Sequence, residues 1–108
     1  MKELNEVLEE INNSIDKYHN LQLKQVIEQS EILRSLTSSL FWLEKYRVEA
    51  HEKWNSTYFQ SQGKSGAAKE READLKVPEL YMIRRIMTGG YKVVDSIRST
   101  ISIHKKEG

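Results

Sequence analysis

Apolar residues recur at alternating steps of three and four along most of this chain, and this spacing constrains the fold more than any other feature. It places apolar side chains on one side of an α-helix, and no segment shows the strict alternation of a half-buried strand. The chain contains a single proline, Pro78, so long helices can form without interruption. We therefore predict an all-α fold in a single domain over residues 1–108.

Three apolar stripes define the expected helices. The first helix spans about 3–18 and carries Leu4, Leu8, Ile11, Ile15 and Tyr18. The second spans about 24–60 and carries Val26, Leu33, Leu36, Leu40, Leu43, Arg47, Ala50 and Trp54. The third region, about 67–104, carries Leu80, Ile83, Met87, Gly90, Val94, Ile97 and Ile101. Pro78 either kinks this region or separates a short helix from a longer one, and the sequence leaves both possibilities open.

Residues 61–66 contain two glycines and two serines and form the clearest break in the pattern. The long segments on either side match in length, so we predict an antiparallel hairpin of 24–60 and 67–104 with its loop at 61–66. We expect the N-terminal helix, within residues 1–20, to serve self-association into a homo-oligomer, because a two-helix hairpin leaves much apolar surface uncovered. Gly89 and Gly90 lie in mid-helix, which we interpret as close packing against a bulky neighbour rather than as a hinge.

Several functional classes lack their characteristic residues. The chain has no cysteine, and His19, His51 and His104 have no carboxylates at ligand spacing. The segment Gly63–Ser65 lacks the earlier glycine and the strand of a phosphate-binding P-loop. No apolar run reaches the roughly 20 residues of a membrane span, and the acidic amphipathic N-terminus does not resemble a signal peptide. We therefore expect a cytoplasmic protein that is not an enzyme, uses no cofactor or metal and does not bind membranes.

The formal net charge of +1 conceals an uneven distribution. Residues 1–30 carry three basic and six acidic residues, whereas residues 79–108 carry six basic and three acidic ones. In the C-terminal segment the charges fall into two columns with a period of seven: Arg84, Tyr91, Arg98 and Lys105, and then Arg85, Lys92, Ser99 and Lys106. A cationic ribbon of this kind, with one aromatic ring in it, suits a polyanion.

The region 41–64 mixes aromatic and basic residues, as single-stranded nucleic-acid sites do. Trp54 continues an apolar stripe and is expected to be core, while Tyr58 and Phe59 near the loop are equally consistent with either role. Arg47 interrupts the stripe, either to extend its charged end to solvent, to pair with an acid or to mark a ligand site. The candidate nucleic-acid contacts are Lys53, Tyr58, Lys64, Arg84, Arg85, Tyr91, Lys92, Arg98 and Lys105.

Short sequence features over about 42–105 resemble the UvsY-like recombination mediators of T-even phages. They are Trp42-Leu43, Glu49-Ala50 with Lys53, Tyr58-Phe59 before Gly63, Ala73-Asp74, Tyr81, and the run from Val94 to Ser99. The resemblance implies a helical, self-associating phage protein, in the host cytoplasm, that holds single-stranded DNA and helps a recombinase to load. One departure is clear: Asn55, Ser56 and Thr57 stand where the family carries a lysine and an arginine.

We therefore expect a non-catalytic, single-stranded DNA-binding recombination accessory protein that also contacts a recombinase or a single-strand binding protein. The alternative is a helical adaptor, or a small phage inhibitor of a host or defence enzyme, whose basic ribbon meets an acidic protein surface instead of DNA. The sequence does not give the stoichiometry of the oligomer or the identity of the protein partner.

Overall fold

The protein is built from four α-helices. The computed structural model describes residues 2–21, 25–61 and 63–107, with the side chains of 104–107 excluded. The helices are α1 (Leu4–His19), α2 (Val26–Gln60), α3 (Gly66–Lys76) and α4 (Glu79–Glu107). Helix accounts for 89% of this part of the chain, and no strand occurs in it. The predicted all-α fold with an N-terminal helix and a hairpin is confirmed.

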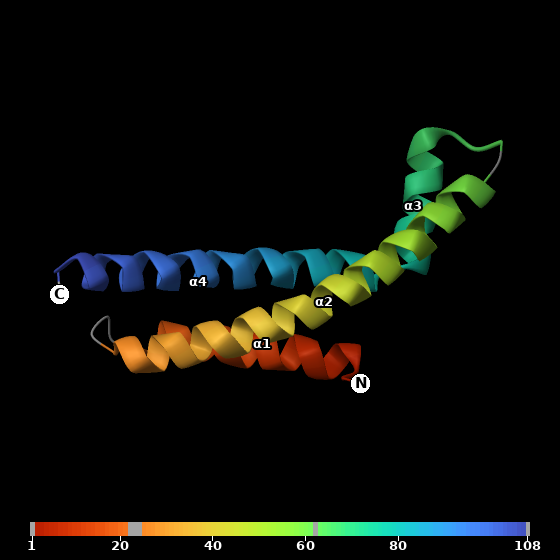
Figure 1. The fold of residues 1–108 in the computed structure, drawn as a ribbon. Helices are drawn as coiled ribbons and strands as arrows, with labels where there is room; N and C mark the ends of the chain where they lie inside the picture. Colours follow the sequence, from red (N-terminus) through yellow and green to blue (C-terminus); the bar gives the residue numbers. More distant parts are fainter. Residues whose placement is uncertain (1, 22–24, 62, 108) are drawn as a thin grey trace.

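Three of the helices form an elongated bundle (Figure 1). α1 and α4 run in the same direction, and the first part of α2 packs antiparallel to both of them. The remainder of α2 extends beyond the bundle and pairs with α3, so the molecule has a bent outline of 63 × 27 × 19 Å. The bundle therefore provides the hydrophobic core, while α3 forms a small hairpin with the distal end of α2.

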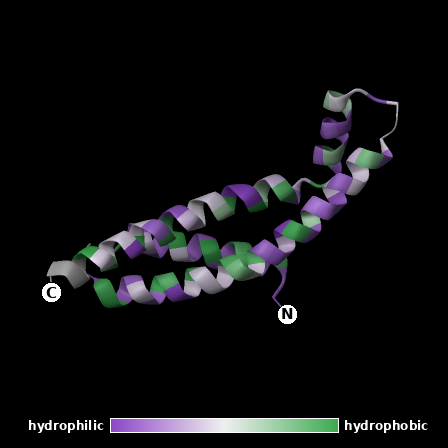
Figure 2. Ribbon diagram, turned by 45° about the horizontal axis from the view of Figure 1, so that its top comes forward, coloured by the Kyte–Doolittle hydropathy of each residue, from purple (hydrophilic) through white to green (hydrophobic). Residues whose placement is uncertain are grey.

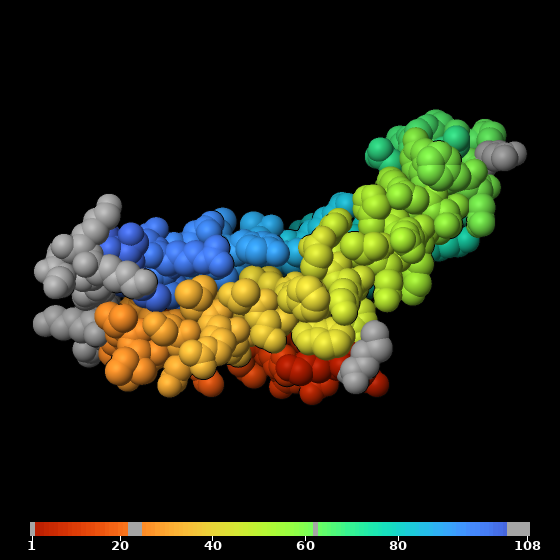
Figure 3. All heavy atoms as spheres, in the orientation of Figure 1, coloured from red at the N-terminus to blue at the C-terminus, as the bar shows by residue number. Residues whose placement is uncertain are grey.

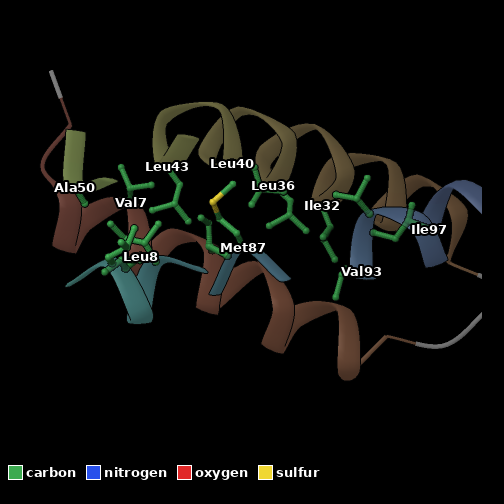
Figure 4. Packing of buried hydrophobic residues seen from close by; sticks show 14 of the residues in the cluster. Val7, Leu8, Ile32, Leu36, Leu40, Leu43, Ala50, Met87, Val93 and Ile97 are labelled. Carbon is green, nitrogen blue, oxygen red and sulfur yellow. The ribbon is translucent and has the colours of Figure 1, made fainter. Parts of the chain in front are cut away.

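The core lies along the axis of the bundle, between α1, α2 and α4 (Figure 4). Leu36, Leu43, Ile83 and Ile97 are completely buried, as the predicted stripes require. Burial extends beyond those stripes to Val7, Ile32 and Val93. The reason is geometric: a helix in a three-helix bundle contacts two neighbours, so its apolar face is wider than the single stripe of a hairpin.

Pro78 separates two helices. α3 ends at Lys76 and α4 begins at Glu79, and the two helices point in different directions (Figure 1). Val77 is buried between them, and its amide donates to the carbonyl of Ala73 at 3.0 Å. The predicted second arm of the hairpin, 67–104, is thus not one straight rod: α3 packs on the distal part of α2 and α4 on the proximal part.

The gap between α2 and α3 lies within the predicted loop at 61–66, with Gly66 already in α3, although Gln62 lies outside the described residues. Gly63 adopts φ = 82°, which favours glycine because it has no β-carbon. The Ser65 hydroxyl then accepts a hydrogen bond from the amide of Ala68 at 3.2 Å, which caps the start of α3. Glycine and serine therefore perform the turn and capping roles that their positions indicated.

Of the two glycines in α4, Gly90 allows the close packing that was predicted. A β-carbon on Gly90 would lie 2.9 Å from Cδ2 of Leu40 on α2. A β-carbon on Gly89 would lie 3.7 Å from Cδ1 of Ile15 on α1, which is an ordinary van der Waals distance. Gly90 therefore sets how near α4 comes to α2, whereas Gly89 faces α1 without crowding.

The apolar stripe of α1 is buried within its own chain. Polar contacts hold this helix as well: the Ser39 hydroxyl donates to the Glu10 carboxylate at 3.2 Å, and Lys2 pairs with the same carboxylate at 3.0 Å. The Tyr46 hydroxyl donates to the carbonyl of Lys2. Self-association therefore stays a prediction, and it would have to use surfaces other than this stripe.

Hydrophobic and hydrophilic segments alternate along the bundle helices, whereas α3 is mainly hydrophilic (Figure 2). In the described part of the chain, none of the helices has a stretch long and apolar enough to cross a lipid bilayer.

Candidate nucleic-acid interface

The two basic columns of α4 point in different directions. Residues adjacent in sequence are about 100° apart around a helix, so the Arg84 column and the Arg85 column cannot share one line. Arg84 faces α2, since one of its guanidinium nitrogens lies 3.1 Å from Nδ1 of His51. Arg85 and Lys92 are exposed on the outer side of α4, away from the buried Ile83 and Val94. The predicted ribbon therefore consists of one column beside α2 and a second one facing solvent.

α2 and α4 lie against each other in Figure 3. A groove lies between these two helices. Its wider part, of about 560 Å³, is lined by Arg34, Thr37 and Phe41 of α2 and by Arg98 of α4. A narrower part, of about 250 Å³, shares Thr37, Phe41 and Arg98 with the wider part and also includes Tyr91. We call both parts together the α2–α4 groove. It combines two guanidinium groups and two aromatic rings from different helices.

The acid in this groove is paired internally. Glu44 lines the narrower part, and its carboxylate lies 2.6 Å from a guanidinium nitrogen of Arg47, one turn further along α2. The hydrogen bond from Arg47 lowers the pKa of the Glu44 carboxyl, and the same hydrogen bond raises the pKa of Arg47. Arg47 therefore occupies its place in the apolar stripe as the partner of a nearby acid, which was one of the three predicted roles.

Phe41 lies at the rim of the groove and is 62% exposed. The Lys45 ammonium lies 5.0 Å from the centre of its ring and 4.7 Å from the centre of the Trp42 ring. These distances are within the range of cation–π attraction. The cation and the exposed ring together form a surface on α2 that suits a ligand with both negative charge and an aromatic group.

The other candidate residues on α2 lie elsewhere, towards the α3 hairpin. His51, Trp54 and Tyr58 form a stacked series, with ring centroids 6.4 and 5.4 Å apart. The indole nitrogen of Trp54 donates to Asp74 at 2.8 Å, and the side chain packs against the core, as predicted. Tyr58 is partly buried, with the Lys69 ammonium 5.5 Å from its ring centre. The Tyr58 ring thus contacts Trp54, Phe59 and Lys69, and because it is less exposed than Phe41 it is a weaker candidate for binding a base.

The two lysines predicted in this region are also separate from the α4 columns. Lys64 pairs with Glu72 at 2.7 Å, and this contact, with a hydrogen bond from Ser61, lowers the pKa of the Glu72 carboxyl. Lys53 is exposed beside a hollow that also contains Glu49 and Glu52. The side chain of Lys105 lies outside the described part. The structure thus brings Tyr91 and Arg98 together at one groove, but not with Lys53, Tyr58 or Lys64.

Arg34 and Phe41 complete the groove and were not among the candidate contacts, although Phe41 begins the mixed aromatic and basic region 41–64. A signal for them was present, because these residues are seven apart on α2 and Lys45 follows four residues later. The three side chains therefore share one side of the helix. What the sequence does not reveal is that this side of α2 lies next to the Tyr91–Arg98 side of α4.

An acidic groove lies between α1 and α2. It has a volume of about 770 Å³, and its charged residues are Asp16, Lys17, Glu28 and Glu31. The charge that is unevenly distributed along the sequence is therefore also separated in space, with acidic side chains between α1 and α2 and exposed cations on α4.

Over the residues described, there is no cluster of three or more histidine and acidic side chains that could hold a metal ion. Comparisons with protein-family models, curated proteins and solved structures gave no match to this chain.

Proposed function

We propose that this protein is a non-catalytic, single-stranded DNA-binding accessory protein of homologous recombination. The observation that carries the proposal is the cationic surface of α4 and its groove. Arg34, Arg85, Lys92 and Arg98 have no ion-pair partner among the described side chains, and two partly exposed rings lie close by. Such cations commonly bind phosphates, and exposed rings stack with unpaired bases.

Binding would be sequence-independent. The columns consist of guanidinium and ammonium groups repeated along a straight helix, which suits a regular phosphate backbone. The resemblance to recombination mediators supports a role beside a recombinase or a single-strand binding protein. Where that family has a lysine and an arginine this chain has Asn55, Ser56 and Thr57, so the α4 surface would supply the phosphate contacts instead.

Binding of a fluorescent oligothymidine of about 15 nucleotides tests the proposal. We expect the affinity to fall steeply as the salt concentration rises. The slope of log affinity against log salt concentration should be about −0.7 for each phosphate contact. A duplex of the same length should bind more weakly, because its bases are already stacked and paired. Absence of binding to the single strand at low salt would contradict the proposal and favour an adaptor that meets an acidic protein surface.

We also propose that the protein acts as a homo-oligomer, in which several α4 surfaces bind one strand together. Such an oligomer would have to leave the α4 surfaces free for the strand, so its contacts would form through other parts of the chain. Large exposed apolar side chains outside α4, including Ile27 on α2 and Leu75 on α3, provide surface for these contacts. Light scattering at tens of micromolar protein should give a mass above 12.7 kDa. A monomeric mass at all salt concentrations would refute this.

A further inference from the structure

Two arginines from different helices meet at the α2–α4 groove. Arg34 projects from α2 and Arg98 from α4, and both line its wider part. Neither forms an ion pair with another described side chain. Two guanidinium groups at one concave surface repel each other in the absence of an anion, and a phosphate between them would relieve this repulsion. The wide end of the groove is therefore suited to one anionic group.

The narrow end of the groove is aromatic. Phe41 is 62% exposed and Tyr91 46% exposed, and both rings line this part. A flat apolar ligand would cover ring surface that is otherwise in contact with water. The carboxylate here, Glu44, is paired with Arg47 at 2.6 Å, so its charge is largely compensated. Phe41 and Arg98 line both parts, so the groove places guanidinium groups and aromatic rings side by side.

We propose that the α2–α4 groove is a subsite for one nucleotide of single-stranded DNA. Arg34 and Arg98 hold a backbone phosphate, and the unpaired base lies against Phe41 and Tyr91. An acidic peptide segment would satisfy the arginines but would leave the rings uncovered. The volume of the wider part, about 560 Å³, falls within the range of small-ligand sites. This subsite rests on the proposed function and makes it specific to one location.

The subsite can be tested with two probes of equal length, an oligothymidine and an abasic strand that has the same phosphates but no bases. We expect Phe41→Ala to weaken binding of the oligothymidine by about 5- to 150-fold, the range measured for loss of one stacked base. Binding of the abasic strand should be unchanged. Arg34→Glu should weaken binding of both probes and flatten the salt dependence, because it acts on the phosphate.

Matched controls are available on the same chain. Phe59→Ala removes another exposed phenylalanine of α2, and Arg71→Glu reverses another exposed arginine, on α3. Both controls should bind the two probes as the parent protein does. Phe41 and Arg34 are exposed, so helix content by circular dichroism should be the same in all four variants.

The outcomes separate the subsite from the proposed function. If the parent protein binds neither probe, the proposed function fails and the subsite fails with it. If the parent binds but Phe41→Ala and Arg34→Glu behave like their controls, DNA binding stands and the subsite is refuted. Equal losses for both probes with Phe41→Ala would refute base stacking at the groove. A larger loss with Phe59→Ala than with Phe41→Ala would move the base contact to the α3 hairpin.

Discussion

Charge reversal at Arg85, Lys92 and Arg98 together should abolish binding of single-stranded DNA while leaving the helix content intact. All three side chains are exposed, and none belongs to the buried face of α4. Two unit charges about 4 Å apart interact by roughly 1 kcal/mol in water. Replacing three cations by glutamates changes the charge by six units, so the affinity should fall by more than about 100-fold. The salt slope should also become shallower, by about 0.7 for each phosphate contact removed.

The control must change the net charge by the same amount. Lys17→Glu, Arg71→Glu and Lys76→Glu together do so, and these three side chains are exposed on α1 and α3. Binding measured by fluorescence anisotropy should be only slightly weaker in this control, because long-range repulsion is screened within about 10 Å at ordinary salt. If both triple variants lose binding equally, net charge decides the affinity and the α4 surface is not the interface. If neither loses binding, the basic columns are only a solvated face.

The helices themselves could be predicted to within a few residues, because each boundary has a local chemical cause. Glycine and serine at 61–66 end one helix and begin the next, and Pro78 cannot continue a helix that is already formed. The apolar stripes also identified the buried faces. However, a stripe tells which side of a helix is buried and not which helix covers it. The N-terminal helix was therefore assigned to self-association, whereas Val7 and Ile11 fill the core of their own chain.

The candidate site was predictable only where it lies on one helix. The period of seven in α4 identified Tyr91 and Arg98 directly from the sequence. The contribution of Arg34 and Phe41 depends on the pairing of α2 with α4, which brings together residues fifty or more positions apart. The ion pair of Arg47 with Glu44 is the opposite case, because a spacing of three on a helix makes it visible in the sequence.

Substitution of the two neighbouring glycines of α4 should change the stability in opposite directions. Alanine at Gly89 would meet only Ile15 at 3.7 Å, so Gly89→Ala should raise the free energy of unfolding by up to about 1 kcal/mol through helix propensity. At Gly90 even a β-carbon would lie 2.9 Å from Cδ2 of the buried Leu40. Gly90→Val should therefore lower the free energy of unfolding by about 1–3 kcal/mol, because α4 has to move away from α2. Urea unfolding at fixed protein concentration measures both changes.

A double-mutant cycle identifies Leu40 as the cause. Leu40→Ala alone should cost about 2–5 kcal/mol, because it leaves a cavity in the core. In the double variant the valine at Gly90 would occupy part of that cavity, so its destabilisation should be smaller than the sum of the two single effects. The coupling should amount to about 0.5–3 kcal/mol, as for residues in direct contact. Strict additivity, or a Gly90→Val variant as stable as Gly89→Ala, would mean that Gly90 is not what sets the distance between α2 and α4. Because Arg34 and Arg98 line the groove between the same two helices, a wider spacing would also separate these two guanidinium groups.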